Sequence, residues 1–181
     1  YEHGDDRIKT RTILQHIYHH ALHDRFYEAR NMLLMSRLQD EIHYADIPTQ
    51  IIYNRAITQL GLSAFRCGLI QHSYDILTEI CSSQRAKELL AQGLTRFQQD
   101  KKQQVEIKEQ SAERSRLVPY HMTINLDMLE AVYLICSMLL EIPTLVKRSF
   151  AIKKKSLSKP FKKLLDFYDR QVFSGPPENT R

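Results

Sequence analysis

The chain has 181 residues, of which 43% are hydrophobic and 26% are charged. This is the composition of a globular protein with one buried core, and it excludes a disordered or fibrous chain. The net charge of +5 is unevenly distributed, because residues 144–165 hold eight cations and no acid, whereas the rest holds 18 cations and 21 acids. The sequence therefore predicts a slightly acidic body with one basic segment.

Apolar residues recur at spacings of three and four over residues 5–22 and again over 25–39, which predicts two amphipathic helices. The turn between them is so short that the helices must lie antiparallel. Asp24 stands where its side chain can cap the second helix. The predicted apolar faces comprise Leu14, Ile17, Tyr18, Ala21 and Leu22 in the first helix and Phe26, Ala29 and Leu33 in the second.

A second pair of helices is predicted over residues 49–67 and 70–81, after a connection that Pro48 ends. Thr49 is the expected N-cap, and Gly68 is expected to break the pair. The packing residues of its first helix are Tyr53, Ala56, Ile57, Leu60 and Ala64.

The second pair also alternates small and large residues, as a tetratricopeptide repeat does where two helices approach closely. These residues are Leu60, Gly61, Gly68, Ser73 and Leu77. Helix pairs that cannot bury their apolar faces alone stack on their neighbours. We therefore expect an all-α fold, a tetratricopeptide-like helical-repeat solenoid of antiparallel helix pairs.

Beyond the second pair, Ser83 is the expected cap of a further helix. Its apolar stripe is Ala86, Leu89, Leu90, Leu94 and Phe97. Residues 98–116 are rich in Gln, Lys and Glu and have too few apolar side chains to offset the cost of ordering them. We expect a charged linker or a solvated helical extension there, after hairpin repeats over residues 1–97.

Residues 117–172 are expected to add further helices to the same solenoid. Asn125 should cap a helix over 126–142, which is apolar nearly all round and should be covered on most sides, and Pro143 should end it. A last helix is predicted over 159–172, with Pro160 in its first turn. Its stripe is Phe161, Leu164, Leu165 and Tyr168. Residues 173–181 have the pattern of a turn leading into a following domain.

The three cysteines are widely spaced, and each lies among apolar residues: Cys67, Cys81 and Cys136. An odd number at such positions predicts small buried side chains in a reducing compartment rather than a disulfide. No charged start with an apolar run marks a secretion signal. The apolar run over 126–142 is too short and holds too many acids to span a bilayer. We expect a cytoplasmic protein without membrane contact.

Four histidines recur on one side of the first helix, opposite its packing stripe: His16, His19, His20 and His23. Pairs of imidazoles four residues apart could hold Zn²⁺, but no thiol or carboxylate ligand stands nearby in the sequence, so no metal site is predicted. We interpret them as a polar surface that faces solvent or a partner. No nucleophile motif, phosphate-binding glycine loop or close pair of carboxylates is present, so neither an enzyme nor a cofactor is predicted.

The basic segment is the strongest functional signal in the residues themselves. It interleaves cations with aromatic side chains and has no acid to neutralise it. Its cations are Lys147, Arg148, Lys153, Lys154, Lys155, Lys159, Lys162 and Lys163. Three interpretations stay open: contact with RNA phosphates, contact with an acidic protein partner, or a solvated loop followed by an amphipathic helix.

Several long blocks appear in order along most of the chain: HALHDRFYEARNMLLMS, IYNRAITQLGLSAFRCGLI with ILTEICSS, VPYHMTINLDMLEAVYLICSMLLEIP and GPPENTR. Together they resemble the family of the c subunit of eukaryotic translation initiation factor three. The resemblance implies the helical-repeat region before that subunit's C-terminal PCI domain, hence a PCI-type solenoid. The 98–116 stretch and the basic segment contribute little to it.

The resemblance further implies a scaffold without catalytic residues. Its partners would be other PCI-type subunits and the small ribosomal subunit, with ribosomal RNA as a further candidate. A stand-alone helical-repeat adaptor that binds a peptide in its concave groove is the alternative function.

Overall fold

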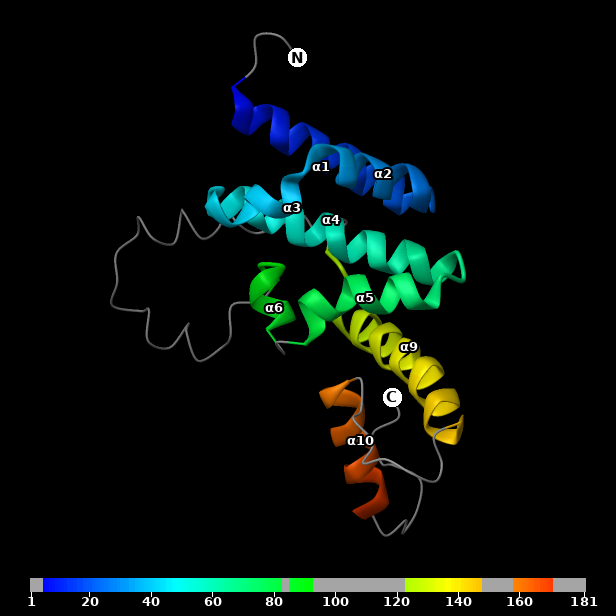
Figure 1. Ribbon diagram of the computed structural model, residues 1–181. Coiled ribbons are helices and arrows are strands. Elements are labelled where there is room, and N and C mark those ends of the chain that lie inside the picture. Colours follow the sequence, from blue (N-terminus) through cyan, green and yellow to red (C-terminus); the bar gives the residue numbers. More distant parts are fainter. Residues whose placement is uncertain (1–4, 83–84, 93–122, 148–157, 171–181) are drawn as a thin grey trace, which may run out of the picture.

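The computed structural model describes residues 5–82, 85–92, 123–147 and 158–170. All regular structure within these ranges is helical, which confirms the all-α prediction. Figure 1 shows the helices following one another from α1 and α2 at one end to α10 at the other. They are α1 (Asp6–Leu22), α2 (Phe26–Ser36), α3 (Leu38–Glu41), the 3₁₀ helix η1 (Ile42–Tyr44), α4 (Ile47–Arg66), α5 (Ile70–Cys81), α6 (Ala86–Leu89), α9 (Leu126–Lys147) and α10 (Lys159–Arg170).

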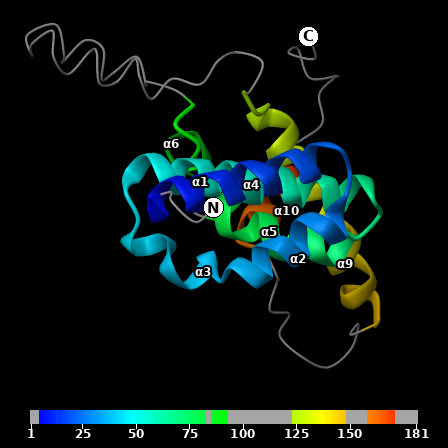
Figure 2. The ribbon, with the colours of Figure 1, turned by 90° about the horizontal axis from the view of Figure 1, so that it is seen from above.

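Helices α1 and α2 form one hairpin, and α4 and α5 form a second. The hairpins pack through α1 and α4, which Figure 2 shows one above the other. Beyond the second hairpin, α5 packs on α9 and α9 on α10. Neighbours in this series therefore bury their apolar faces against each other, as expected for stacked helix pairs.

The first core cluster lies between α1, α2 and α4, and it contains the packing residues predicted for these helices with two exceptions. Tyr18 is only partly buried at the edge of the cluster. Leu22 is 49% exposed, because α1 ends at this residue and the chain turns away. The buried members include Leu14, Ile17, Ala21, Phe26, Ala29, Leu33, Tyr53, Ala56, Ile57, Leu60 and Ala64.

The predicted cap of α2 is wrong. Asp24 has a left-handed backbone conformation (φ 59°), and its carboxylate accepts a hydrogen bond from Arg66 of α4. Arg66 also donates to the carbonyl oxygen of Ala21. Asp24 therefore ties the turn of the first hairpin to the end of α4. Helix α2 stops at Ser36, earlier than predicted, because Arg37 is also left-handed, and α3 and η1 occupy most of the predicted connection.

Helix α4 begins two residues earlier than predicted, so Thr49 is not its N-cap. Pro48 lies in the first turn, where a missing N–H costs no helical hydrogen bond. Thr49 is buried and donates from Oγ1 to Oδ1 of Asp46 at 2.6 Å. The break at Gly68 (φ 78°) and the bounds of α5 are as predicted.

A second core cluster joins α4, α5 and α9. It contains Leu62, Tyr74, Leu77, Ile80, Leu90, Ile124, Leu129, Val132, Tyr133 and Cys136. Helix α4 thus contributes to both clusters. The helix predicted after Ser83 is a single turn, α6, followed by the buried Leu90. Ser83, Leu94, Phe97 and the segment 98–116 lie outside the described residues.

Asn125 caps α9 as predicted, since its Oδ1 accepts the backbone N–H groups of Asp127 and Met128 at 3.0 and 3.1 Å. The predicted end at Pro143 is wrong, because α9 continues to Lys147. Pro143 removes one helical hydrogen bond, and it lies on the exposed side, where water can solvate the carbonyl left without a partner. Within the described residues α5 and α10 pack on this helix and leave one side open, so cover on most sides stays a prediction.

The start of α10 is as predicted, at Lys159 with Pro160 in the first turn. Ser158 precedes it and accepts the backbone N–H of Phe161 on Oγ at 3.3 Å. Phe161 is buried, but the predicted stripe does not continue inward: Leu164 and Leu165 are 51% and 39% exposed. The side chain of Tyr168 lies outside the described residues.

Candidate interaction surfaces

The structure places the four histidines of α1 away from the core. His16, His19 and His23 are exposed and His20 is half-buried. The rings of His19 and His23 lie 4.5 Å apart. The pKa of His19 is lowered by partial loss of solvent and by the neighbouring charges of His23 and His20. Glu28 of α2 lies 3.0 Å from Nδ1 of His20, at ion-pair distance but without hydrogen-bond alignment.

No group of three or more His, Cys, Asp or Glu side chains in the described ranges is arranged to hold a metal ion. The histidine face can therefore offer polar contacts and, when protonated, positive charge.

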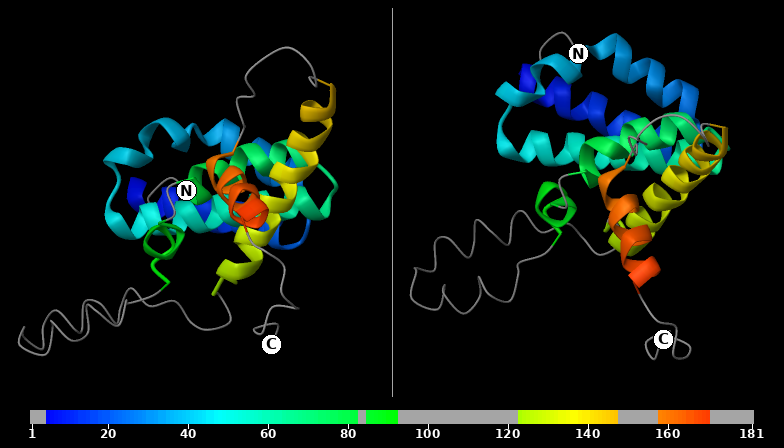
Figure 3. Two further views of the ribbon diagram at one scale, coloured as in Figure 1. Left: turned by 90° about the horizontal axis from the view of Figure 1, so that it is seen from below. Right: turned by 60° about the horizontal axis from the view of Figure 1, so that its bottom comes forward.

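Three of the eight candidate cations have described side chains, and all three are exposed on α10: Lys159, Lys162 and Lys163. Lys147 is the last residue of α9, and its side chain is not described. Arg148, Lys153, Lys154 and Lys155 lie outside the described residues. Figure 3 shows α10 beside α9, so the described part of the basic segment is carried on a helix attached to the body.

Buried polar groups attach α10 to α9. Glu141 of α9 is 2% exposed, and its Oε1 accepts the backbone N–H of Ser158 at 2.6 Å. The Ser158 hydroxyl lies 3.4 Å from that of Tyr133, whose ring stacks on Tyr74 of α5. Burial, with Tyr133 beside it, raises the pKa of Tyr74 to about 12. A network of buried polar side chains thus holds the start of α10. These side chains lose their contact with water together when α10 packs on α9.

Sequence reasoning missed this attachment. A local signal existed, since a serine two residues before Pro160 is a common helix start. No comparable signal marks Glu141 as its partner.

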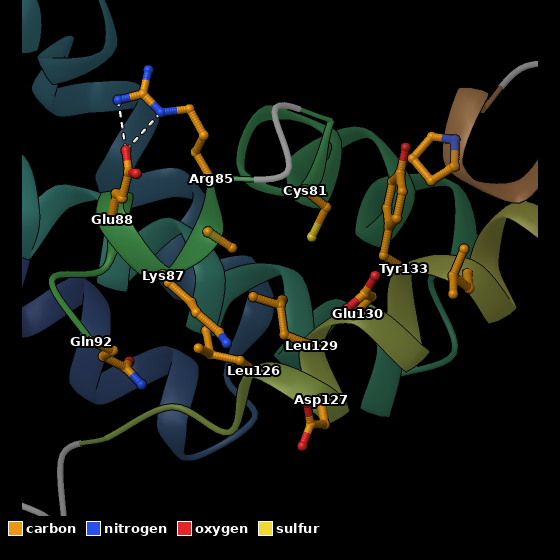
Figure 4. A pocket seen from close by; sticks show the side chains of 13 residues that line it. Cys81, Arg85, Lys87, Glu88, Gln92, Leu126, Asp127, Leu129, Glu130 and Tyr133 are labelled. Carbon is orange, nitrogen blue, oxygen red and sulfur yellow. Dashed lines mark hydrogen bonds and ion pairs between the residues drawn. The ribbon is translucent and has the colours of Figure 1, made fainter. Parts of the chain in front are cut away.

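A hollow of about 560 Å³ opens between the end of α5, α6 and the starts of α9 and α10 (Figure 4). Its apolar lining includes Leu126, Leu129, Tyr133 and Pro160. Charged side chains border it: Arg85, Lys87, Glu88, Asp127 and Glu130. Arg85 and Glu88 pair with each other at 2.7 Å. Such a lining can accept an apolar side chain with a polar end.

The thiol in this hollow is not activated. Burial, with Glu130 beside it, raises the pKa of Cys81 to about 12, so it is a neutral thiol at physiological pH.

Long-range bonds hold the wall of this hollow, and sequence reasoning missed them as well. Asn54 of α4 donates to the carbonyl oxygen of Leu89 at 2.9 Å. Arg55, which is 8% exposed, donates through Nη2 to that of Leu90 at 2.8 Å. Burial lowers the pKa of Arg55. These bonds satisfy the carbonyl groups at the end of α6.

Two hydrogen bonds join the two described segments on either side of residues 93–122. The side-chain amide of Gln92 donates to the carbonyl oxygen of Ile124 at 2.6 Å and accepts the backbone N–H of Ile124 at 3.0 Å. The side-chain amide of Gln92 thus satisfies both the backbone N–H and the backbone carbonyl of Ile124. The residues before and after the intervening segment therefore lie side by side.

The cysteines are free, but the prediction that all three are buried is wrong for one. Cys136 is buried, Cys81 is half-buried and Cys67 is exposed. Cys67 follows the last residue of α4, where the chain leaves the core. No helix of the described residues is long and apolar enough to cross a membrane.

Comparison with known proteins identifies the chain's relatives. Residues 1–152 match the sequence model of the family described as eukaryotic translation initiation factor 3 subunit 8 N-terminus. A Phaeosphaeria nodorum protein, named as the c subunit of eukaryotic translation initiation factor 3, is 49% identical over 183 residues, which cover 100% of this chain and 21% of that protein. Proteins of the same name from Schizosaccharomyces pombe and Xenopus tropicalis are 48% and 49% identical, over 100% and 97% of this chain and 20% and 19% of their own length.

The chain thus spans about a fifth of the length of the curated relatives it matches. Identity near one half along the whole chain confirms the resemblance in the blocks of the sequence. The chain belongs to the family of the c subunit of eukaryotic translation initiation factor 3.

Proposed function

We propose that this chain is the helical-repeat region of a scaffold subunit of translation initiation factor 3. It would organise partner subunits and the small ribosomal subunit in the cytoplasm during initiation. The observation that carries the proposal is the 49% identity, over the entire chain, with a protein named as a subunit of this factor. The stack of helices supports it, because stacked pairs present long lateral surfaces for binding.

Two arginines of the described residues have structural partners. Arg66 pairs with Asp24 across the first hairpin, and Arg55 holds the end of α6. Both arginines therefore serve the fold. We propose that the subunit is not an enzyme and acts through its surfaces, with the histidine face of α1 as one candidate contact.

The first test is affinity purification of the tagged subunit from eukaryotic cytoplasm, with and without nuclease, read by mass spectrometry. Recovery of other factor 3 subunits that survives nuclease is the expected result. Recovery of neither initiation-factor subunits nor ribosomal proteins would contradict the proposal. It would favour the stand-alone adaptor instead.

We also propose that the basic segment, from Lys147 to Lys163, contacts ribosomal RNA of the small subunit. Lys159, Lys162 and Lys163 are exposed on a helix that buried contacts hold in place, so their charges are available to a partner. Neutralised phosphates release counterions, and each contributes about −0.7 to −0.9 to the log–log slope of affinity against salt.

Charge reversal of these three lysines to Glu tests the contact. We expect weaker binding to small ribosomal subunits and a salt slope lower in magnitude by about 2 to 3. The control reverses three exposed cations elsewhere, Arg7, Arg25 and Arg37, and so changes the net charge equally. Equal losses in both variants, or no loss in either, would contradict contact through this segment. An acidic protein partner would instead give binding that resists nuclease.

A further inference from the structure

Helix α4 carries a row of buried polar side chains that its own hydrogen bonds do not account for. Residues four apart are neighbours on a helix surface, so Arg55, Gln59 and Ser63 form a single row. They are 8%, 8% and 0% exposed, and Oγ of Ser63 has no hydrogen-bond partner. Buried polar groups are nearly always hydrogen-bonded, so a row with free donors indicates a role outside the fold.

Arg55 uses only part of its guanidinium group within the fold. Its Nε and Nη2 donate to the carbonyl oxygen of Leu90, and Nη1 has no hydrogen-bond partner in the described part of the chain. No acid of the described residues forms an ion pair with Arg55. A buried charge without a partner of opposite sign destabilises a fold, because nothing offsets its loss of hydration. The free N–H groups of Nη1 are therefore donors for an anion from outside.

Two further groups without partners lie beside this guanidinium. The side-chain amide of Gln59 makes no hydrogen bond to the described residues, although the residue is buried. Tyr18 is half-buried on α1, the helix that packs on α4 (Figure 2), and its hydroxyl has no described partner either. Tyr18 and Arg55 are close enough for each to alter the pKa of the other.

Solvent reaches the free polar atoms of these three residues. Among the described residues, only two buried side-chain polar atoms without a partner are closed off from solvent, Nδ1 of His20 and Oγ of Ser63. Neither belongs to Tyr18, Arg55 or Gln59. A ligand atom that approaches along α1 and α4 can therefore replace the water at these three groups.

The chemistry of the three groups favours a carboxylate as the ligand. The guanidinium, the amide and the phenol all offer hydrogen-bond donors, and the only charge among them is positive. A carboxylate has two oxygens to accept such bonds, and its single negative charge matches the single cation. RNA is instead bound through several neutralised phosphates, which need several cations, whereas this row offers one.

We propose that Arg55, Gln59 and Tyr18 form a site for the carboxylate of an Asp or Glu side chain from another subunit of translation initiation factor 3. The inference rests on the proposed function, since it takes its partner from that assembly. One carboxylate oxygen would accept from Nη1 of Arg55, and the other from the amide of Gln59 or the hydroxyl of Tyr18. The acid of the partner thus neutralises a buried cation that the described chain leaves unpaired.

The double substitution Tyr18→Phe and Gln59→Leu removes two groups that have no hydrogen-bond partner in the fold. We therefore expect the free energy of unfolding of the chain, measured in urea, to stay unchanged or to rise slightly. The matched control is Tyr27→Phe with Gln39→Leu, at exposed positions. A loss of stability confined to the first variant would show that these groups serve the fold, and it would overturn the proposal.

A photo-reactive amino acid at Gln15 of the complete subunit, expressed in cells, reports on the binding itself. Gln15 is exposed on α1, one turn before Tyr18. We expect crosslinks to another factor 3 subunit, in a peptide that contains Asp or Glu. The double substitution should lower their yield by about tenfold or more, because bonds to a charged group are lost, and its control should not. Crosslinks only to RNA or to the same polypeptide, an unchanged yield, or no crosslink would overturn the proposal.

The acid found by the crosslink gives an independent result. Neutralising it in the partner, as Asp→Asn or Glu→Gln, should lower the yield as strongly as the double substitution does, and combining the two changes should add little. Fully additive losses would reject this carboxylate site while leaving the proposed function intact. If even the unaltered subunit recovers no other subunit on affinity purification, the proposed function itself fails.

Discussion

At the scale of single residues, the three thiols differ in their surroundings. Cys67 is exposed at the end of α4. Burial and the nearby Glu130 raise the pKa of Cys81 to about 12. Burial also raises the pKa of Cys136, although a hydrogen bond with Ser73 offsets part of this increase. Because the thiolate is the reactive form, exposure and pKa together should rank the three residues.

We predict that iodoacetamide at neutral pH modifies Cys67 first, with Cys81 and Cys136 following only slowly. Mass spectrometry of digested samples taken over time would measure the three rates. Cys67→Ser should remove the fast phase and leave the slow ones unchanged. Labelling of Cys81 at the rate of Cys67 would contradict the burial described for the α5 end.

Asp46, before α4, is a residue whose protonation should affect stability. A hydrogen bond from Thr49 is the main cause that lowers its pKa from 3.8, and Arg11 of α1 lowers it further. A lowered pKa means that the folded state favours the carboxylate. Its contribution is therefore present above pH 3.8 and is lost as the pH falls through the lower, folded-state value.

We predict that Asp46→Asn lowers the free energy of unfolding at neutral pH and that this difference shrinks as the pH falls below 3.8. Urea unfolding at a series of pH values would measure it. Asp166→Asn, at an exposed position on α10, serves as the control and should show little difference at any pH. A constant deficit for Asp46→Asn across the range would show that ionisation of Asp46 is not involved.

At the scale of the helices, Gly61 sets how closely α4 and α5 pack. A Cβ added there would lie 2.5 Å from Cδ2 and 2.8 Å from Cγ of Leu77. Either the Leu77 side chain or the two helices would have to move. This close approach is what the alternation of small and large residues predicted.

We predict that Gly61→Ala destabilises the protein by about 1 to 3 kcal/mol, the usual cost of overpacking, although alanine favours a helix by about 1 kcal/mol. Chemical denaturation would measure the change. Adding Leu77→Ala should make room, so the double variant should lose less than the sum of the single ones. Strictly additive losses would show that the contact with Leu77 is not the cause.

Helix existence and packing faces could be predicted because they follow from periodicity, and local signals such as Asn125 and Gly68 acted as predicted. Asp24 is an equally good helix cap by its local sequence, but its carboxylate accepts a hydrogen bond from Arg66, 42 residues away, instead of capping α2. Pro143 failed as a stop because it lies on an exposed side of α9. Predictions from local sequence signals failed where a side chain distant in sequence, or contact with solvent, determined the conformation.

For the candidate surfaces, too, sequence periodicity predicted some features, and contacts between distant residues determined others. Placing the histidines of α1 opposite the core needed only the helical period. Glu141 and Ser158 are 17 residues apart, and Gln92 and Ile124 are 32 apart, on elements whose relative placement no periodicity encodes. The side of α9 that α5 and α10 leave open could not be foreseen either, because an apolar residue looks the same in sequence whether or not a neighbour covers it.

At the scale of the whole molecule, α4 couples the two core clusters. Tyr53, Ile57 and Leu60 pack in the first cluster, and Leu62 packs in the second. The two sets lie on one continuous helix, so losing the packing on one side removes support from the other. The described helices of both clusters should therefore unfold together rather than as independent units.

We predict that Leu14→Ala in the first cluster and Leu129→Ala in the second each lower the free energy of unfolding by about 2 to 5 kcal/mol. Both residues are almost fully buried. Each substitution should shift one common transition, seen as equal calorimetric and van't Hoff enthalpies. Met35→Ala, at an exposed position, should change the stability by less than about 0.5 kcal/mol. If Leu129→Ala split the transition in two, α4 would not transmit stability between the clusters, and the first hairpin would fold by itself.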